Sequence, residues 1–331
     1  MPRVSDLGED GVLARIIPRL GRGDATLVGP GDDCAVLRVV GDLVVTTDTL
    51  VEGQHFLRSW GSAHEVGERA AAQNLADVAA MGARPIALVV GLALPGDTDA
   101  QWVADFADGL NVRAQQVGAG VEGGDLTRSA SEIVIGVTAL GALEGRPPVL
   151  RDGARVGDAI VVAGTLGRSQ TGLELYQAGH VTGAGQIDAD DMDACAAALA
   201  AECTRIYRAP VPPLETAIAG AESLHAMMDI SDSLARDASR MGRASGVTMA
   251  LSSAAMAPFA QAIAPLDPWC AQSALRRVLT GGEDHGFLAT CDPARIPAGF
   301  VTVGQVVAPR EASLEVDGHP FKGTLGWESL P

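Results

Sequence analysis

The sequence has 331 residues, which is long enough for two domains of ordinary size. Apolar residues make up 47% of it and aromatic residues only 4%, so we expect an interior built from Ala, Val, Leu and Ile. The formal net charge of -17 argues against a nucleic-acid or anionic-membrane partner, because both require a basic face.

The first half of the sequence predicts two strands followed by alternating helices and strands. Residues 35–40 and 43–48 alternate as strands, and Gly41-Asp42 between them predicts a hairpin turn, because glycine accepts a positive φ. Ser62 and Glu65 form a capping box for a helix that ends near Met81. Other predicted elements are a helix over about 5–20, a buried strand over 86–94, a helix over 99–117, and strands over 121–128 and 132–143.

Arg146-Pro147-Pro148 marks the predicted boundary between two domains, residues 1–145 and residues 149–331. The second half again mixes strands and helices, which predicts a second α/β unit. Its predicted elements are strands over 159–163, 226–230, 286–290 and 301–306, with helices over 189–207 and 233–243.

Cysteine usage and hydropathy indicate the compartment. The five cysteines form no CxxC pair and leave one over, which is typical of a reducing environment. The sequence starts MPRVSDLGED, without an apolar signal region, and the strongest apolar run, Ile86–Leu94, is far shorter than the ~20 residues that span a bilayer. We therefore expect a cytoplasmic protein without a membrane partner.

Lysine is almost absent from the sequence. Lys322 is the only lysine, whereas there are 23 arginines. No GxxxxG precedes it, so a Walker A P-loop is excluded. No HRD or DFG triplet of a protein kinase occurs either. Any phosphate chemistry must therefore use another set of residues.

Aspartates recur beside glycine or at the ends of predicted strands. Asp is common in turns because it bends and caps backbone, and for any single position this is the simpler interpretation. Several separate segments that each end in Asp could instead converge as hard oxygen ligands for Mg²⁺. The aspartates concerned are Asp32, Asp33, Asp48, Asp125, Asp229 and Asp232.

Asp77 lies on the predicted helix in the segment NLADVAAMGA. It is aligned with Arg69 and Gln73 at four-residue steps, so periodicity favours a solvent-exposed helix face. The small neighbours Ala76 and Ala80 offer the alternative that the helix packs closely and directs one carboxylate inward.

Two glycine-rich turns and one histidine are weaker signals. Gly123-Gly124-Asp125 and Gly281-Gly282-Glu283-Asp284 would let backbone N–H groups approach a phosphate, but such turns are more often ordinary. His55 could shuttle a proton or donate to a phosphate, although a histidine at a strand end is the simpler interpretation.

Taken together, seven motifs resemble those of thiamine-monophosphate kinases, in the same order and at similar spacing. They are GPGDDCA, TTDTLVEGQHF, NLADVAAMGA, GGDLTR, RDGARVGD, DISDSLARD and GGEDHGF, and they extend over the chain from the first helix onward. The same superfamily includes aminoimidazole ribonucleotide synthetase, selenophosphate synthetase and a hydrogenase-maturation protein.

The resemblance implies a two-domain α/β fold of the aminoimidazole ribonucleotide synthetase type, with mixed sheets covered by helices and no P-loop. It implies a homodimer whose N-terminal domains, residues 1–145, bind ATP and several Mg²⁺ ions. Residues 149–331 would complete the nucleotide and substrate site. The implied reaction transfers the γ-phosphoryl group of ATP in line to thiamine monophosphate and gives thiamine diphosphate.

The resemblance also implies roles for single residues, none of which is an acid or a base. Three departures from the family pattern concern the substrate side: Ser233 replaces a glycine, His285-Gly286 replaces Tyr-Glu, and the tail GWESL lacks the usual aromatic ending. The implied metal ligands are Asp33, Thr46, Thr47, Asp48, Asp77, Asp125, Asp229 and Asp232; the nucleotide contacts are Gly124, Asp125, Arg151 and Ser231; the substrate contacts are His55, Glu283 and Trp327.

Two alternatives remain open. One is another ATP-dependent enzyme of the superfamily, of the aminoimidazole ribonucleotide synthetase type. The other is a non-catalytic acidic module that binds metal ions. A nucleotide-binding measurement distinguishes the second alternative from an ATP-dependent enzyme, because an inert metal-binding module should not bind ATP.

Overall fold

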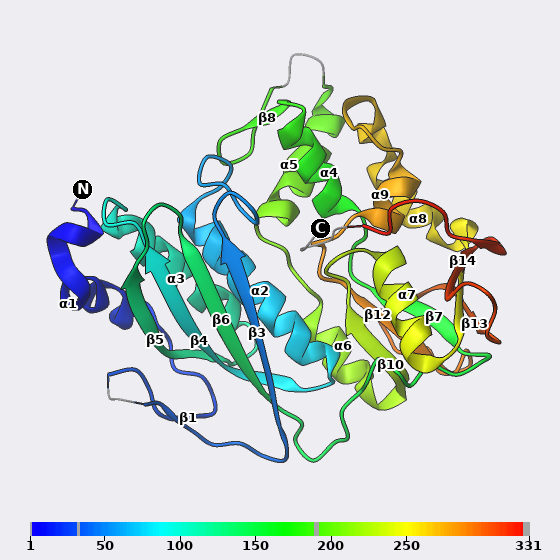
Figure 1. The fold of residues 1–331 in the computed structure, drawn as a ribbon, viewed down its shortest axis with the longest axis horizontal. Coiled ribbons are helices and arrows are strands. Elements are labelled where there is room, and N and C mark those ends of the chain that lie inside the picture. The colour runs from blue at the N-terminus through cyan, green and yellow to red at the C-terminus, as the bar shows by residue number, and fades with distance from the viewer. Residues whose placement is uncertain (1, 32–33, 189–191, 327–331) are drawn as a thin grey trace. The chain divides into compact units, whose positions relative to one another are not determined.

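The computed structural model describes residues 2–31, 34–188 and 192–326, shown as a ribbon in Figure 1. These residues form two compact units, one from the chain up to 79 together with 83–147, the other from 80–82 together with 148 onward. None of the helices in the described part of the chain has the length and apolar character needed to cross a bilayer.

The first unit is built on a four-stranded mixed sheet. Its strand order is β3-β6-β4-β5, in which β4 and β5 are parallel and the other neighbours antiparallel. Helices α2 and α3 lie together on one face of this sheet (Figure 1). The bounds are α1 Val4–Ile16, η1 Ile17–Arg19, β1 Thr26–Val28, β2 Val36–Leu37, β3 Leu43–Val51, α2 Ala63–Ala80, β4 Arg84–Leu94, α3 Ala100–Gln115, β5 Gly120–Arg128 and β6 Val134–Ala142.

Two glycines allow α2 and α3 to pack backbone against backbone. A Cβ added to Gly67 in α2 would lie 2.1 Å from the Phe106 carbonyl oxygen of α3. One added to Gly109 in α3 would lie 1.9 Å from the His64 carbonyl oxygen of α2. Any side chain at either position would force the helices apart, so the glycines set how deeply α2 is buried.

The opposite face of this sheet carries exposed apolar side chains. Leu43 and Val45 of β3 are 47% and 58% exposed, and Val89 of β4 is 38% exposed. Their strand neighbours that face the helices are buried, as Leu88 and Val90 show. The alternation of each strand therefore gives one face covered by α2 and α3 and one open face with apolar residues.

The predicted hairpin of residues 35–40 and 43–48 is wrong. β2 pairs with β1 in a separate two-stranded sheet, whereas β3 pairs with β6 over all nine of its residues. Gly41 does adopt a positive φ of 76°, but it connects strands of two different sheets. The alternating run of β6 is longer than residues 36–37, so a distant partner offers β3 more ladder hydrogen bonds than the adjacent one.

The second unit is built on a seven-stranded mixed sheet with order β10-β12-β7-β13-β11-β14-β15, in which only β11 and β14 are parallel neighbours. Strand β7, predicted over 159–163, has all five residues buried. The strands are β7 Ala159–Ala163, β10 Leu224–Asp229, β11 Thr248–Leu251, β12 Phe287–Cys291, β13 Val301–Val307, β14 Leu314–Val316 and β15 His319–Pro320, and the small hairpin is β8 Val181–Thr182 with β9 Gln186–Ile187. The helices are α4 Arg168–Gln177, α5 Ala194–Arg208, α6 Leu214–Gly220, η2 Ala221–Ser223, α7 Leu234–Ser245, α8 Ser253–Ile263, η3 Ala264–Trp269 and α9 Ala274–Thr280.

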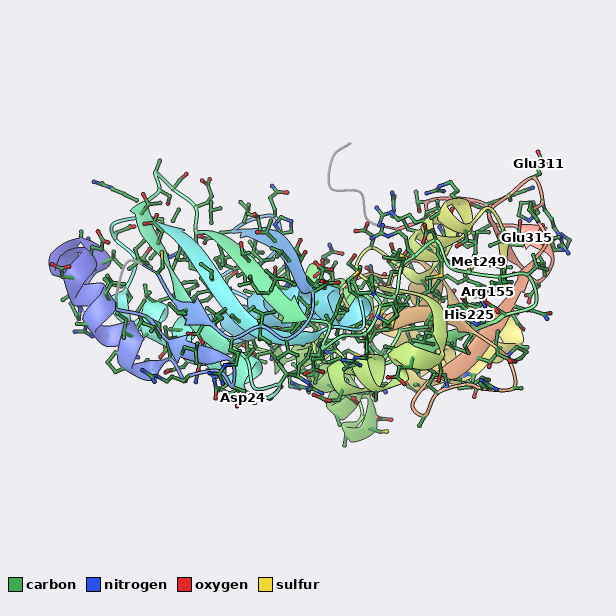
Figure 2. The ribbon with its side chains drawn as sticks, turned by 90° about the horizontal axis from the view of Figure 1, so that it is seen from below. Asp24, Arg155, His225, Met249, Glu311 and Glu315 are labelled. Atoms are coloured by element: carbon green, nitrogen blue, oxygen red, sulfur yellow. The ribbon has the colours of Figure 1, made fainter. Side chains whose placement is uncertain are left out.

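A polar contact ties β10 to the turn that precedes β7. His225 Nδ1 lies 3.0 Å from both carboxylate oxygens of Asp158, which is buried. Arg155 Nη1 lies 3.3 Å from the other ring nitrogen of His225, and the two residues lie side by side in Figure 2. Asp158 Oδ2 also accepts from the Arg155 N–H, so one carboxylate orders the turn and joins it to the sheet.

Asp284, in the loop before β12, closes the N-terminus of α4. Its carboxylate accepts hydrogen bonds from Thr165 Oγ1 at 2.8 Å and from the Gly167, Arg168 and Ser169 N–H groups at 2.9–3.4 Å. These donors include N–H groups that have no partner within the helix, so Asp284 acts as a cap supplied from a distant segment. Burial raises the pKa of Asp284, and the hydrogen bonds oppose that shift.

Candidate functional site

Three of the predicted metal ligands meet between β3 and α2. Thr46 Oγ1 of β3 donates a 2.8 Å hydrogen bond to Asp77 Oδ2 of α2. Asp48, two residues along β3, accepts a 3.2 Å hydrogen bond at Oδ2 from Gln73 Nε2, one turn before Asp77. Period two in the strand and period 3.6 in the helix thus place Thr46, Asp48 and Asp77 on facing surfaces.

The helix residues around Asp77 are buried, so the interpretation of a solvent-exposed helix face is wrong. Arg69 is 4% exposed, Gln73 is 8% exposed and Asn74 is fully buried. Asn74 Oδ1 accepts from the Asp48 N–H at 3.1 Å, while its Nδ2 donates to the Ala70 carbonyl. Gln73, which was expected on an exposed helix face, and Asn74, which was not predicted at all, therefore hold Asp48 at α2.

Thr47 and Asp125 are placed on the other face of the sheet. Thr47 Oγ1 donates to the Val137 carbonyl oxygen at 3.0 Å and accepts from Thr138 Oγ1 at 3.2 Å. Asp125 pairs with Gly91, and its neighbour Leu126 pairs with the buried Leu92, so Asp125 belongs to the open face. The structure does not bring these two side chains to Thr46, Asp48 and Asp77.

Gly124 is required by the sheet itself. A Cβ at Gly124 would lie 1.9 Å from the Val90 carbonyl oxygen, so no side chain fits there. His55 follows β3 in a tight turn, where its Nδ1 accepts a 3.0 Å hydrogen bond from the Val51 N–H. This bond assigns the ring proton of a neutral His55 to Nε2.

In the second unit, two loops bring together Asp229, Ser231, Asp232 and Glu283. The Glu283 N–H donates to the Ser231 carbonyl oxygen at 2.8 Å. A Cβ on Gly282 would lie 2.4 Å from the same oxygen, so glycine is needed for this approach. The motifs DISDSLARD and GGEDHGF are therefore adjacent in space, although about fifty residues separate them in sequence.

Asp232 is not isolated, because Arg240 of α7 binds it. Arg240 Nη1 lies 2.5 Å from Asp232 Oδ2 and 2.8 Å from Asp237 Oδ1. Asp237 is fully buried and accepts from the Asp232 and Ser233 N–H groups at 3.3 Å each. Burial and the nearby charge of Asp229 raise the pKa of Asp237 to about 7. The sequence did not reveal Asp237 and Arg240 as supports of this loop.

His285 is a buried residue between two predicted functional carboxylates. Its Nδ1 lies 3.5 Å from Asp229 Oδ2 and its Nε2 lies 3.6 Å from Glu283 Oε2. Burial lowers the pKa of His285, but the contacts with Asp229 and Glu283 outweigh it and raise the pKa to about 10. A histidine thus lies between the two carboxylates where the family pattern has tyrosine.

Arg151 lies along the free edge of β10, since the Leu150 carbonyl accepts from the Met227 N–H of that strand. Arg151 is exposed and its carbonyl accepts from Ser245 Oγ at 3.1 Å. The remaining predicted site residues, Asp33 and Trp327, lie outside the described residues, as does Asp32.

No group of three or more His, Cys, Asp or Glu side chains among residues 2–31, 34–188 and 192–326 is arranged to hold a metal ion. A pocket of about 280 Å³ lies in the first unit, with Asp24, Arg38, Arg84 and Glu144 among its lining residues (Asp24 in Figure 2). It contains none of the predicted site residues. The polar clusters described above, rather than this pocket, are the candidate functional site.

Two family models match the chain. They are those of "AIR synthase related protein", its N-terminal domain over residues 31–143 and its C-terminal domain over residues 155–317. The fold, with two mixed sheets each covered by helices and no P-loop, is that of this class of proteins.

Relatives with curated names and with solved structures identify the family within this class. A thiamine-monophosphate kinase of Mycobacterium tuberculosis is 39% identical and aligns with 99% of this chain and 93% of its own length. The solved thiamine-monophosphate kinase of Stenotrophomonas maltophilia is 29% identical, with a TM-score of 0.77 over 94% of this chain and 96% of its own. A structure of AaThiL complexed with AMPPCP and TMP is 27% identical, with a TM-score of 0.73 over 100% and 99% of the two chains. The chain belongs to the thiamine-monophosphate kinase family of the AIR synthase related proteins.

Proposed function

We propose that the protein transfers the γ-phosphoryl group of ATP to thiamine monophosphate and releases thiamine diphosphate and ADP. The observation that carries the proposal is the similarity to thiamine-monophosphate kinases over nearly the whole chain. It is supported by the relative that was solved with AMPPCP, an ATP analogue, and TMP. The contacts of Thr46, Asp48 and Asp77, within motifs quoted for the resemblance, agree with it.

The donor set between β3 and α2 fits Mg²⁺, which prefers hard oxygen ligands. Two carboxylates are supplied there, by Asp48, which accepts a hydrogen bond from Gln73, and by Asp77, which lies one helical turn after Gln73. Thr46 adds a hydroxyl group. Bound Mg²⁺ ions would neutralise phosphate oxygens that carboxylates otherwise repel. We infer that Asp33, Asp229 and Asp232 also serve as ligands, and that Thr47 and Asp125 act separately on the open face.

The remaining roles concern binding and orientation. Gly124, Asp125, Arg151 and Ser231 would contact the nucleotide, and the Arg151 guanidinium suits bidentate binding of phosphate oxygens. His55, Glu283 and Trp327 would contact the acceptor. A phosphate monoester has its second pKa at about 6, so the acceptor is mostly ionised at neutral pH and no residue has to remove its proton.

The first test of this proposal is the choice of acceptor. Incubation with ATP, Mg²⁺ and thiamine monophosphate should yield thiamine diphosphate, whereas free thiamine should yield nothing. An alcohol would require a base, and no predicted role supplies one. The products are separated by chromatography to show which acceptor was converted. A precursor of aminoimidazole ribonucleotide is included as a third substrate, to test the alternative enzyme of the superfamily. Phosphorylation of free thiamine would contradict the proposal, and a protein that fails to bind ATP would be the acidic metal-binding module.

We also propose a homodimer, with residues 1–145 as the dimerisation and ATP-binding domain and residues 149–331 as the domain that completes the site. The support is the open face of the first sheet, where Leu43, Val45 and Val89 are exposed. The unpaired cysteines support a cytoplasmic location.

The second test is the mass in solution. Light scattering at micromolar concentration should give a mass near twice 33.8 kDa. Val45→Glu should shift the protein towards the monomer, because it places a charge on the open face. Val211→Glu is the matched control, since Val211 is similarly exposed but belongs to the second unit. A mass near 33.8 kDa for the unaltered protein contradicts the dimer.

A further inference from the structure

The side chain of Gln73 donates a hydrogen bond to one of the proposed metal ligands. Its Nε2 lies 3.2 Å from Asp48 Oδ2, and only 8% of Gln73 is exposed. A buried amide has little water to bond with instead, so this contact fixes the direction of the Asp48 carboxylate. Because Gln73 is neutral, it orients the carboxylate without adding a positive charge that would repel a metal ion beside it.

The next helix residue, Asn74, holds the backbone of the same aspartate. β3 is the first strand in the order of its sheet, so among the described residues no further strand pairs with its outer edge. The Asp48 N–H donates to Asn74 Oδ1 at 3.1 Å. Asn74 Nδ2 donates to the Ala70 carbonyl oxygen at 2.9 Å, which turns the amide so that its oxygen faces β3. Two successive residues of α2 thus fix the side chain and the backbone of Asp48.

The bonds between β3 and α2 are reciprocal. Asp48 of β3 accepts from Gln73 of α2, while Asp77, one turn further along α2, accepts from Thr46 of β3. Each carboxylate is therefore oriented by a donor on the facing element. These bonds join protein groups alone, so they orient the two carboxylates independently of the metal, and an ion that binds there has less ordering of its ligands to pay for.

We propose that Gln73 is a positioning residue that orients the Asp48 carboxylate and thereby sets the affinity of this site for Mg²⁺. The proposal rests on the proposed function, in which Asp48, Asp77 and Thr46 hold Mg²⁺. Gln73 does not bind the ion, but acts through Asp48 Oδ2. Hydrogen bonds to a metal-binding carboxylate typically contribute a factor of about 10–100 to metal affinity.

The variant that tests this role is Gln73→Met. Methionine removes the amide donor but keeps a long, unbranched side chain with a high helix propensity, so α2 should stay packed on β3. The matched control is Gln101→Met in α3. Gln101 Nε2 donates to Asp105 Oδ1 at 2.8 Å, so the control loses an amide–carboxylate bond of the same kind in the same unit. Asp105 is not one of the proposed metal ligands.

Thermal unfolding at increasing Mg²⁺ concentration, with and without AMPPCP, measures metal affinity in the absence of turnover. An ion that binds only the folded protein raises Tm once its concentration exceeds Kd. For the same rise in Tm, Gln73→Met should need about 10–100 times more Mg²⁺ than the unaltered protein, and Gln101→Met the same amount as the unaltered protein.

Two results of this titration would overturn the proposal. The first is a Tm of Gln73→Met that is lower at every Mg²⁺ concentration but depends on Mg²⁺ as in the unaltered protein, because Gln73 would then only stabilise the packing of α2. The second is an unaltered protein whose Tm does not rise with Mg²⁺ in either titration, because the site would then hold no metal ion.

Steady-state kinetics separate metal affinity from the chemical step. Gln73→Met retains every proposed ligand, so at saturating Mg²⁺ both kcat and the KM for thiamine monophosphate should return to within about threefold of the unaltered values. A kcat that stays low at saturating Mg²⁺ would contradict a role limited to metal affinity. Failure of the proposed function is distinguishable, because then no acceptor is converted while the altered Mg²⁺ dependence of Tm persists.

Discussion

Asp77→Asn should lower turnover about 10³-fold or more while the protein stays folded. Loss of one charge-stabilising group typically costs about 10²–10³ in rate, and a ligand that faces phosphates through Mg²⁺ should cost at least as much. Asparagine keeps the size of the side chain and an oxygen that can accept from Thr46 Oγ1, which donates to Asp77 at 2.8 Å. The packing of α2 on β3 should therefore survive, and the lost charge is the main change.

The measurement is kcat for thiamine diphosphate formation, together with circular dichroism to verify the fold. Asp97→Asn is the control, because Asp97 is an exposed aspartate in the turn before α3 and should keep full turnover. The substitution should also weaken Mg²⁺ binding, so a titration of activity against Mg²⁺ should reach half-maximal activity at a higher metal concentration. Near-normal turnover of Asp77→Asn would exclude a role in catalysis and indicate a structural role, such as accepting the hydrogen bond from Thr46.

Asp284→Ala should lower the free energy of unfolding of the second unit by at least about 3 kcal/mol, since each buried donor left without a partner costs about 1–3 kcal/mol. The substitution removes the acceptor for Thr165 Oγ1 and for three N–H groups at the start of α4. Water cannot replace it easily, because Asp284 is only 4% exposed. Asp284→Asn should cost less, as the amide oxygen still accepts from part of this set.

Urea unfolding at fixed protein concentration, followed by circular dichroism, measures the effect. The matched control is Asp193→Ala, which removes the exposed N-cap of α5 and its 2.8 Å bond from the Ala196 N–H. That loss should cost only about 1 kcal/mol, the usual value for a cap. An equal loss in the free energy of unfolding for the two variants would show that the buried cap of α4 stabilises the protein no more than an exposed cap does.

Local sequence signals correctly identified elements whose determinants are adjacent in the chain. Ser62 and Glu65 form the predicted capping box, with the Ser62 N–H bonded to Glu65 Oε2 at 2.9 Å and the Glu65 N–H to Ser62 Oγ at 3.2 Å. The predicted strand 159–163 coincides with β7. Such signals depend on three or four successive residues, so they do not require knowledge of the rest of the fold.

Predictions failed where the partner of an element was distant. Residues 35–40 and 43–48 satisfy the local rule for a hairpin, yet β3 pairs with a strand about ninety residues away. Asp77 satisfies the rule for an exposed helix face, yet α2 is buried between the sheet and α3. Periodicity states which residues share a face, but it does not state what covers that face.

The sequence by itself determined the class of fold, the family and the set of candidate residues, because contiguous motifs carry that information. Only the tertiary structure decided that Thr46 and Asp48 face Asp77 while Thr47 and Asp125 lie on the opposite face of the sheet. It alone placed Asp284 at the start of α4 and the Leu325 carbonyl oxygen on the hydroxyl of Ser233. These contacts join residues about 30 to 120 positions apart, and they form because chain packing, rather than local propensity, selects the partner of each buried polar group.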